Sequence, residues 1–251
     1  MKQKPSNHSA FTLIELLVVI SIIAILAGIA LPVFGEVKVR GDQTKALSNA
    51  KQIGTACKIY ATDNNGQYPH LAAYPTTSSP TTTNTEASAS SNANLVLGIL
   101  IPDYLPDRNI FVNVKSAFTK KYQTAQTSEG LPVNTNEWAY VSGLSDTSNS
   151  RWPLLGDGFK PGTEANDPAY SLDEATPGGI WKGKKAVVIR VDGSGTVETL
   201  KTGALTVKRT ESDDGNAFKG DPASQTTPGK LQWFSNDAAS GVFVLNPITP
   251  Q

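Results

Sequence analysis

The chain is poor in the residues from which catalytic and metal sites are usually built. Its 251 residues include one cysteine, Cys57, and two histidines, His8 and His70. A single cysteine excludes an internal disulfide bond and any metal site that needs several thiolates. The sequence contains no phosphate-binding glycine loop, no H-E-x-x-H pattern and no G-x-S-x-G pattern. We therefore expect that the protein is not an enzyme.

Charge is also scarce, and neither sign dominates. Charged residues make up 18% of the chain, and its 22 basic residues balance its 22 acidic ones. An even balance gives no general attraction to the phosphates of a nucleic acid. We expect no nucleic-acid partner.

Apolar residues are concentrated in one long run, Leu13–Phe34, in which Glu15 is the only ionisable residue. As a helix the run would be roughly 33 Å long, enough to cross a hydrocarbon core of about 30 Å. A cleaved secretory signal is one alternative, but it usually has a shorter apolar region of about 7–15 residues and a small-x-small cleavage site. A simple membrane anchor is a second alternative, which explains the length and leaves Glu15 unexplained. If the run stays in the membrane, the lipid bilayer is a partner of the protein.

A motif marks the start of this run. The polar, basic leader MKQKPSNHSA is followed at Phe11 by F-T-L-I-E-L. This motif resembles the N-terminal signal of prepilins, the precursors of type IV pilins and of type II secretion pseudopilins. The resemblance implies that a prepilin peptidase cuts between Ala10 and Phe11 and then N-methylates Phe11. The family usually has glycine before the cut, so Ala10, with the next smallest side chain, predicts slower cleavage.

Glu15 lies four residues from the terminus that this cleavage would create. A carboxylate in a membrane helix is expensive and usually functional. One interpretation is that its side chain extends to the lipid headgroups. The other pairs it with the α-amino group of Phe11, which is mostly protonated at neutral pH because its reference pKa is about 7.7–8.0. The resemblance implies that this amine belongs to a neighbouring subunit, which makes Glu15 an assembly residue.

The helical pattern continues beyond the run. Apolar side chains recur at the spacing of an amphipathic helix, and Asn64-Asn65-Gly66 is a stop signal. We expect one helix over residues 11–63, with a kink or a melted stretch at Pro32. The buried face is predicted to hold Leu47, Ala50, Ile53, Cys57 and Tyr60, with Cys57 as a core residue and not a reactive thiol.

Residues 51–69, KQIGTACKIYATDNNGQYP, strengthen the resemblance. They are similar to the helix end of pseudopilin-like proteins found in planctomycetes and verrucomicrobia. The resemblance is strong over residues 10–69 and looser to about residue 200.

The part of the sequence after the helix reads as short strands and long loops. Together with the helix it predicts an α+β fold: a long N-terminal helix packed on a small antiparallel sheet with long loops. Residues 76–94 are rich in Ser and Thr and are predicted to form a mobile surface loop, with O-glycosylation as an alternative. A short helix is expected at Asn94–Ile101 and a hairpin around Asp192-Gly193-Ser194. The expected strands are Glu137–Ser142, Pro153–Leu155, Lys185–Val191, Gly195–Leu200, Leu205–Arg209, Leu231–Phe234 and Val242–Leu245. The domains are thus a leader (1–10), a transmembrane half-helix (11–34), an amphipathic half-helix (35–65) and a globular domain (66–251).

An acidic, glycine-containing segment near the C-terminus is a weak calcium candidate. Clustered carboxylates beside glycine can bind calcium through oxygen ligands, and the residues concerned are Asp213, Asp214 and Asp221. Major pseudopilins often hold calcium in a C-terminal loop, so the resemblance points the same way. A solvated acidic turn is the alternative, and no other cofactor is expected.

The resemblance implies a type II secretion pseudopilin: a single-pass protein of the cytoplasmic (inner) membrane with a periplasmic C-terminal domain. Its partners would be copies of itself or related pseudopilins in a filament, together with an inner-membrane assembly platform. The alternative is a subunit of an extracellular type IV pilus with a role in adhesion or DNA uptake. Such pili commonly carry a C-terminal disulfide bond. Pilins that bind DNA usually show a basic face. This chain has one cysteine, and beyond the two leader lysines it has 20 basic against 22 acidic residues, which favours the pseudopilin.

Overall fold

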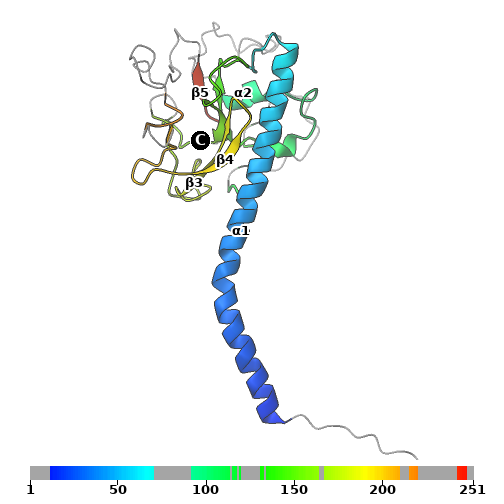
Figure 1. Ribbon diagram of the computed structural model, residues 1–251, viewed down its shortest axis with the longest axis vertical. Helices are drawn as coiled ribbons and strands as arrows, with labels where there is room; N and C mark the ends of the chain where they lie inside the picture. Colours follow the sequence, from blue (N-terminus) through cyan, green and yellow to red (C-terminus); the bar gives the residue numbers. More distant parts are fainter. Residues whose placement is uncertain are drawn as a thin grey trace, which may run out of the picture. The chain divides into compact units, whose positions relative to one another are not determined.

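The computed structural model describes residues 12–70, 92–113, 115–117, 119, 131–132, 134–163, 167–209, 215–219 and 242–247. Two compact units divide the chain, Met1–Asp42 and Gln43–Gln251. Helix α1 (Leu13–Asp63) begins in the first unit and ends in the second (Figure 1). The other described elements all belong to the second unit: α2 (Ala93–Gly98), the 3-10 helix η3 (Arg108–Phe111), β1 (Trp138–Ser142), β2 (Pro153–Asp157), β3 (Lys185–Arg190), β4 (Gly195–Thr199) and β5 (Phe243–Leu245).

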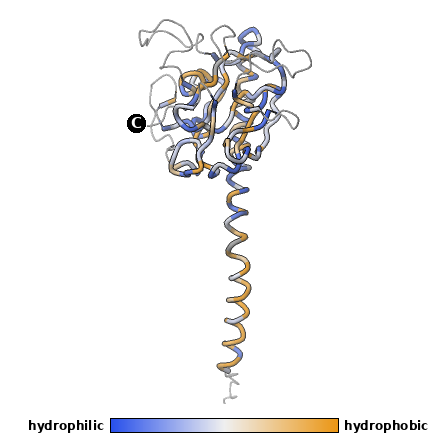
Figure 2. The backbone as a smooth tube through the Cα atoms, turned by 90° about the vertical axis from the view of Figure 1, so that its left-hand side faces the viewer, coloured by the Kyte–Doolittle hydropathy of each residue, from blue (hydrophilic) through white to orange (hydrophobic). Residues whose placement is uncertain are grey.

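In the first unit most residues of α1 are hydrophobic, as the hydropathy colours of Figure 2 show. Among the described residues, every exposed large apolar side chain lies between Leu13 and Val37, apart from Ile59 and Leu172. α1 is also the one described helix that is long and apolar enough to cross a membrane. A continuous apolar surface of this extent is typical of a segment that lies in lipid or packs against other helices.

The helix is uninterrupted through Pro32. Proline removes one backbone hydrogen bond from a helix, but the neighbouring turns can keep the helical path. The melted stretch expected at Pro32 is therefore not seen, and the kink stays a prediction.

The second unit is built on a five-stranded antiparallel sheet with the strand order β4-β3-β2-β1-β5. β1 pairs with β2 through Trp138 opposite Asp157, and with β5 through Tyr140 opposite Leu245. The β3–β4 pair is the hairpin predicted around Asp192-Gly193-Ser194, with Ile189 opposite Gly195. The predicted α+β fold, a long helix followed by a small antiparallel sheet, is confirmed.

The part of α1 that lies in the second unit packs on this sheet. Its buried residues recur every three or four positions, which confirms the predicted amphipathic face, although Leu47, predicted to lie on it, is only half-buried. Gly54 lies so close to β3 that a Cβ atom placed there would be 2.9 Å from Cγ2 of Ile189. The buried side chains of this face are Ala46, Ala50, Ile53, Ala56, Cys57, Tyr60 and Ala61.

Cys57 is a core residue, as predicted. Its side chain is fully buried, and burial raises the pKa of its thiol to about 12. A thiol with so high a pKa holds almost no thiolate at neutral pH and is unreactive.

The end of α1 follows the predicted stop signal. The helix ends at Asp63, and Asn65 and Gly66 then have positive φ angles of 54° and 78°. The N–H of Gly66 donates to the carbonyl of Ala61 at 2.8 Å, which satisfies one of the carbonyls left open by the helix end.

Three sequence predictions need correction. Leu205–Arg209 is not a strand: Leu205 has a positive φ of 54°, and the segment forms only one isolated bridge, Lys208 with Asn216. The predicted loop 76–94 extends too far, because Asn92 caps α2 by accepting the N–H of Leu95, and Asn94 is fully buried. β2 extends two residues beyond Leu155, to Asp157. The predicted strand Leu231–Phe234 lies outside the described residues, as do residues 76–91.

One carboxylate, Asp157, is buried at the end of β2 in the centre of the sheet. Its Oδ2 atom accepts hydrogen bonds from the N–H of Val187 at 2.6 Å and from Nε1 of Trp181 at 2.9 Å. Its Oδ1 atom has no hydrogen-bond partner. Burial raises the pKa of Asp157 to about 7, although the two hydrogen bonds act to lower it.

This pKa predicts that the globular unit loses stability as the pH rises. The folded carboxyl keeps its proton up to about pH 7, whereas the unfolded one releases it near pH 4. The contribution of Asp157 to the free energy of unfolding is therefore fully present below pH 4. As the pH rises from 4 through 7, this contribution should fall by up to about 4 kcal/mol. Urea unfolding of wild type and Asp157→Asn between pH 4 and 8 measures this. The amide oxygen can accept the same two hydrogen bonds, so the variant should show a flatter pH profile; equal slopes would contradict the prediction.

A second prediction concerns solubility. A truncated protein that begins at Glu36 lacks the exposed apolar surface of the first unit and should be a soluble monomer without detergent. The rest of α1 should remain folded because its apolar face packs on the sheet. Size-exclusion chromatography and circular dichroism test this, with the full chain in detergent as the control. Aggregation of the truncated protein would show that the globular unit depends on the apolar segment.

Candidate assembly site

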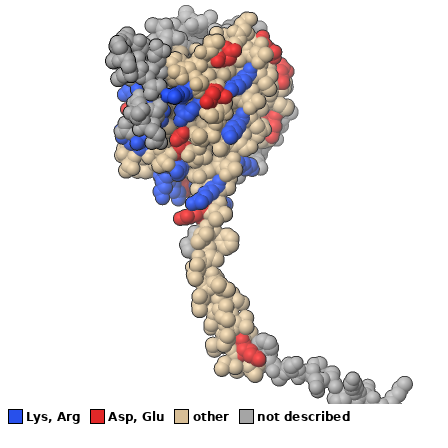
Figure 3. All heavy atoms as spheres, in the orientation of Figure 1, with Lys and Arg blue, Asp and Glu red and all other residues tan. Residues whose placement is uncertain are grey.

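The structure describes two of the predicted N-terminal site residues. Glu15 lies in the first turn of α1, and Pro32 lies within the same helix. The predicted cleavage and methylation residues, Ala10 and Phe11, lie outside the described residues. Between Leu13 and Phe34, Glu15 remains the only ionisable side chain, and Figure 3 shows acidic atoms near the start of an otherwise uncharged helical stretch.

Glu15 and Thr12 bond reciprocally at the helix start. Oε2 of Glu15 accepts hydrogen bonds from the backbone N–H and the hydroxyl of Thr12, both at 2.9 Å. The backbone N–H of Glu15 donates to the hydroxyl of Thr12 at 3.3 Å. Thr12 precedes the first helical residue, so the two residues form a capping box, in which two otherwise open N–H groups are satisfied.

The capping box gives Glu15 a role within its own subunit that the sequence analysis missed. The signal was present in the sequence as T-x-x-E immediately before a long apolar helix. In lipid an open N–H group would be expensive, so a cap of this kind matters more there than at a wet surface. The carboxylate is held at the helix start by contacts within its own chain.

A second polar side chain in the apolar part of α1, Ser21, has its hydrogen-bond partner within the same helix. The hydroxyl of Ser21 donates to the carbonyl of Leu17 at 2.7 Å. This bond satisfies the hydroxyl without any contact outside the helix. Of the polar side chains described between residues 13 and 34, Glu15 is therefore the one that carries a charge into the apolar segment.

The predicted calcium residues Asp213, Asp214 and Asp221 lie outside the described residues. Within the described part of the chain, no three His, Cys, Asp or Glu side chains gather as a metal site. The calcium prediction for these three residues is neither supported nor contradicted.

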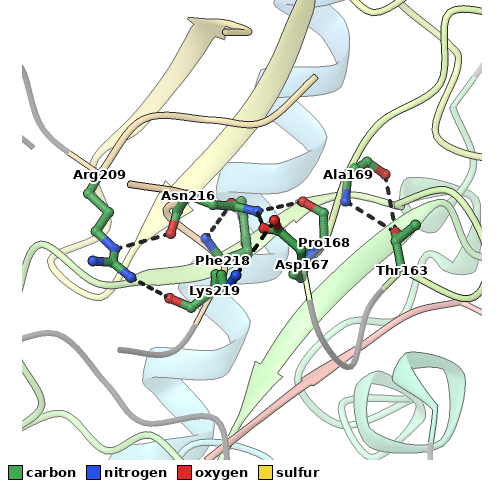
Figure 4. Close-up of polar contacts among 8 residues, drawn as sticks. All are labelled: Thr163, Asp167, Pro168, Ala169, Arg209, Asn216, Phe218 and Lys219. Atoms are coloured by element: carbon green, nitrogen blue, oxygen red, sulfur yellow. Dashed lines mark hydrogen bonds and ion pairs between the residues drawn. The ribbon is translucent and has the colours of Figure 1, made fainter. Parts of the chain in front are cut away.

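The chain on both sides of residues 210–214 is held in place. The N–H of Arg209 donates to the carbonyl of Gly215 at 2.8 Å, and its side chain donates to the carbonyl of Asn216 at 3.2 Å. The side-chain amide of Asn216 in turn donates to Asp167 at 2.9 Å, as Figure 4 shows. These bonds fix the two ends of the segment that contains Asp213 and Asp214.

Comparison with known proteins places the similarity at the N-terminus. Residues 5–31 match the model of the prokaryotic N-terminal methylation motif. The chain is 46% identical over 56 residues to the type IV major pilin protein PilA of Myxococcus xanthus (strain DK1622), which covers 22% of this chain and 25% of that protein. It is 41% identical over 63 residues to the type II secretion system core protein G of Aeromonas hydrophila, which covers 25% of this chain and 43% of that protein.

The chain thus spans less than half the length of either curated relative. No solved structure matches it. The two relatives differ in the system that their names give, a pilus in one case and a secretion system in the other. The motif and the matches support the pilin and pseudopilin family without separating its two branches, and the chain carries a type IV pilin-like N-terminal segment followed by an α+β globular unit.

Proposed function

We propose that this protein is a filament subunit of the pseudopilin kind that serves a type II secretion system. A prepilin peptidase cuts it between Ala10 and Phe11 and methylates Phe11. The first part of α1 anchors it as a single-pass protein in the cytoplasmic membrane, with the globular unit in the periplasm. It acts by assembly with copies of itself or related pseudopilins on an inner-membrane platform, and not by catalysis. Residues 51–69 extend the likeness to pseudopilin-like proteins of planctomycetes and verrucomicrobia.

The observation that carries the proposal is the methylation motif at the start of a long, exposed apolar helix with one charged side chain. The helix supports a membrane anchor and a packing surface for other subunits, because its apolar side chains have no partner within the described chain. The capping box supports a dedicated role for Glu15, because it holds the carboxylate beside the terminus that cleavage would create.

A second candidate function is a subunit of an extracellular type IV pilus. The similarity to a Myxococcus xanthus major pilin favours it. The single cysteine and the slight excess of acidic residues after the leader favour the secretion system. Deletion of the gene separates the two functions. If the protein is a secretion subunit, the deletion should abolish export of proteins to the medium and leave surface pili intact. If it is a pilus subunit, the deletion should abolish the pili and leave export intact.

The processing prediction is that the mature protein begins with a methylated Phe11. Intact-mass measurement of protein extracted from membranes, with and without active prepilin peptidase, checks this. Ala10→Gly should be processed at least as fast as wild type, because glycine is the residue usual in the family. Ala10→Leu should block the cut. A mature protein that begins at Met1 in the presence of the peptidase, or beyond Gly28, would be incompatible with the proposal.

The assembly prediction separates the two roles of Glu15, its charge and its cap. Glutamine at this position can keep the capping box, because its side-chain oxygen accepts the same hydrogen bonds, but it has no charge. If filament assembly needs the carboxylate to pair with a terminal amine, Glu15→Gln and Glu15→Ala should both sharply reduce cross-linked oligomers and secretion. If the cap alone matters, Glu15→Gln should assemble as well as wild type. Thr12→Val and Glu15→Ala, each of which removes the cap, should then both lose cross-linked oligomers and secretion.

The controls use the same helix. Ser21→Ala removes a polar side chain that bonds only within its own turn, so it should leave cross-linking unchanged. The melting temperature of the globular unit should be the same in every variant, because none of these residues belongs to that unit. Equal cross-linking ladders for wild type and Glu15→Gln, at matched membrane levels, would refute the charge pairing.

A further inference from the structure

The globular unit exposes a leucine on its surface. Leu172 is 66% exposed, and outside the apolar part of α1 the only other exposed large apolar side chain among the described residues is that of Ile59. A Cβ atom placed on Gly183 would lie 2.7 Å from Cδ2 of Leu172 and 3.0 Å from Cδ2 of Leu205, which is half-buried. The two leucines therefore lie against the same glycine and form one apolar spot, the Leu172 patch.

The loop that presents Leu172 is held by hydrogen bonds on both sides of it. The N–H of Tyr170 donates to the carbonyl of Leu205 at 2.9 Å, which joins the loop to the segment of the second leucine. On the other side, Oδ1 of Asp173 accepts the N–H of Ala175 at 3.0 Å. The backbone thus directs Leu172 outward from a fixed position.

Backbone strain is concentrated at the same place. Four described non-glycine residues have a positive φ, and two of them, Asn65 and Asn134, are of the type that tolerates it. The other two, Lys182 and Leu205, both have a φ of 54° and both adjoin Gly183, one in the sequence and one in space. Strain of this kind costs stability and is found preferentially at functional sites. The patch is therefore a candidate for a role other than folding.

Positive charge surrounds the patch. Lysines lie on the two segments next to it, before and at the start of β3 and after β4, at Lys182, Lys184, Lys185 and Lys201. The N–H of Leu205 donates to the carbonyl of Lys201 at 2.9 Å, so this lysine belongs to the turn of the second leucine. The acidic residues of the loop are Asp173 and Glu174, and Glu174 forms ion pairs with Lys115 and Lys182. The lysines outnumber these acids, so the patch has a net positive charge.

An exposed leucine among lysines matches the surface of an anionic bilayer. Lysines near such a surface are attracted to the lipid phosphates, and an apolar side chain can enter the boundary between headgroups and acyl chains. A stable protein interface would need about 1,000 Å² of buried area with an apolar centre, and one exposed and one half-buried leucine supply little of that. Charge and size together favour lipid as the partner.

The chain keeps this patch within reach of lipid. Eight residues lie between the end of the apolar run at Phe34 and the start of the globular unit at Gln43. Even if fully extended, this stretch would span no more than roughly 30 Å. A unit tethered so closely meets the bilayer surface often, so weak contacts are enough to hold it there.

We propose that the Leu172 patch docks the globular unit on the surface of an anionic bilayer. The lysines contact the lipid phosphates, and Leu172 enters the headgroup region. The docking rests on the proposed function, because the membrane anchor is what keeps the unit near lipid. In a filament subunit, docking holds the unassembled form at the membrane.

The test uses the full chain reconstituted in vesicles of phosphatidylcholine, with or without phosphatidylglycerol. A polarity-sensitive dye on Ala175→Cys reports whether the loop meets lipid, and Cys57 does not react with the dye because it is buried. With phosphatidylglycerol, the dye emission should shift to shorter wavelength and nitroxide-labelled lipid should quench it. Added salt should reverse both changes, because it screens the lysines from the headgroups.

Two variants and one control separate the parts of the patch. Lys184→Gln with Lys185→Gln should lower the ratio of docked to free unit roughly fivefold for each lysine removed. Leu172→Ser keeps the lysines and should reduce the quenching by nitroxide-labelled lipid. The control has the same dye on Ser150→Cys, at the other end of β3, where the N–H of Asp192 donates to the carbonyl of Ser150 at 3.2 Å. Its dye should stay exposed to water in both kinds of vesicle.

The outcomes separate the docking from the anchor. Equal dye signals in the two kinds of vesicle, or a signal unchanged by the lysine variant, would overturn the docking. An emission shift that follows the density of protein and not the phosphatidylglycerol content would also overturn it, because it would indicate contact with a second copy. If the full chain does not float with the vesicles, the anchor is refuted and the docking with it. A chain that floats but leaves its dye in water refutes the docking alone.

Discussion

Helix α1 can pack on the sheet of the globular unit because Gly54 has no side chain. A Cβ atom at this position would lie 2.9 Å from Cγ2 of Ile189, closer than side-chain carbon atoms normally approach one another. The short distance brings Ile53 and Cys57 into the core, where both are fully buried. The position of Ile189 is itself fixed by the ladders that β3 forms with β2 and β4. The core of this unit therefore depends on a backbone approach that one added methyl group would disturb.

The same close packing accounts for the unusual state of the acids at the edge of the core. Asp157 lies opposite Trp138 in the β1–β2 ladder, and Glu137 is the residue before Trp138, so the sheet that buries the tryptophan buries both carboxylates. Asp157 keeps two hydrogen bonds to one of its oxygens, whereas Glu137 has none. Protons therefore influence the stability of the unit through these two residues, because burial disfavours the charged form of each carboxyl group.

Helix α1 solves two different problems along one continuous element. Between Leu13 and Phe34 its side chains are apolar on nearly all sides, and the only ionisable one, Glu15, is held in the capping box with Thr12. In the second unit one face packs on the sheet, and the other is exposed and mostly polar. The change in pattern reflects a change in surroundings, because an all-round apolar surface needs lipid or other helices, whereas an amphipathic one needs a single apolar partner. The open helix N–H groups explain why the charged residue occurs at the first turn: a carboxylate is stabilised at a helix N-terminus.

The sequence by itself determined the elements whose cause is local. The apolar run, the amphipathic repeat, the stop signal at Asn64-Asn65-Gly66 and the turn at Asp192-Gly193-Ser194 depend on periodicity and on single-residue conformational preferences. The capping box was equally local, and its T-x-x-E spacing could have been found. The motif at the start of the run was sufficient to indicate the pilin-like N-terminal segment, which the comparisons support.

Only the tertiary structure decided the features that depend on distant partners. Residues 205–209 have the composition of a strand, but Leu205 adopts a positive φ, and its carbonyl accepts from Tyr170 in a loop. Asn94 looked like part of a polar loop, yet its side chain donates to the carbonyls of Leu131 and Pro132 in the interior. The burial of Glu137 had no sequence signal at all. A polar residue is buried or exposed according to what the rest of the chain places against it, and no local pattern contains that information.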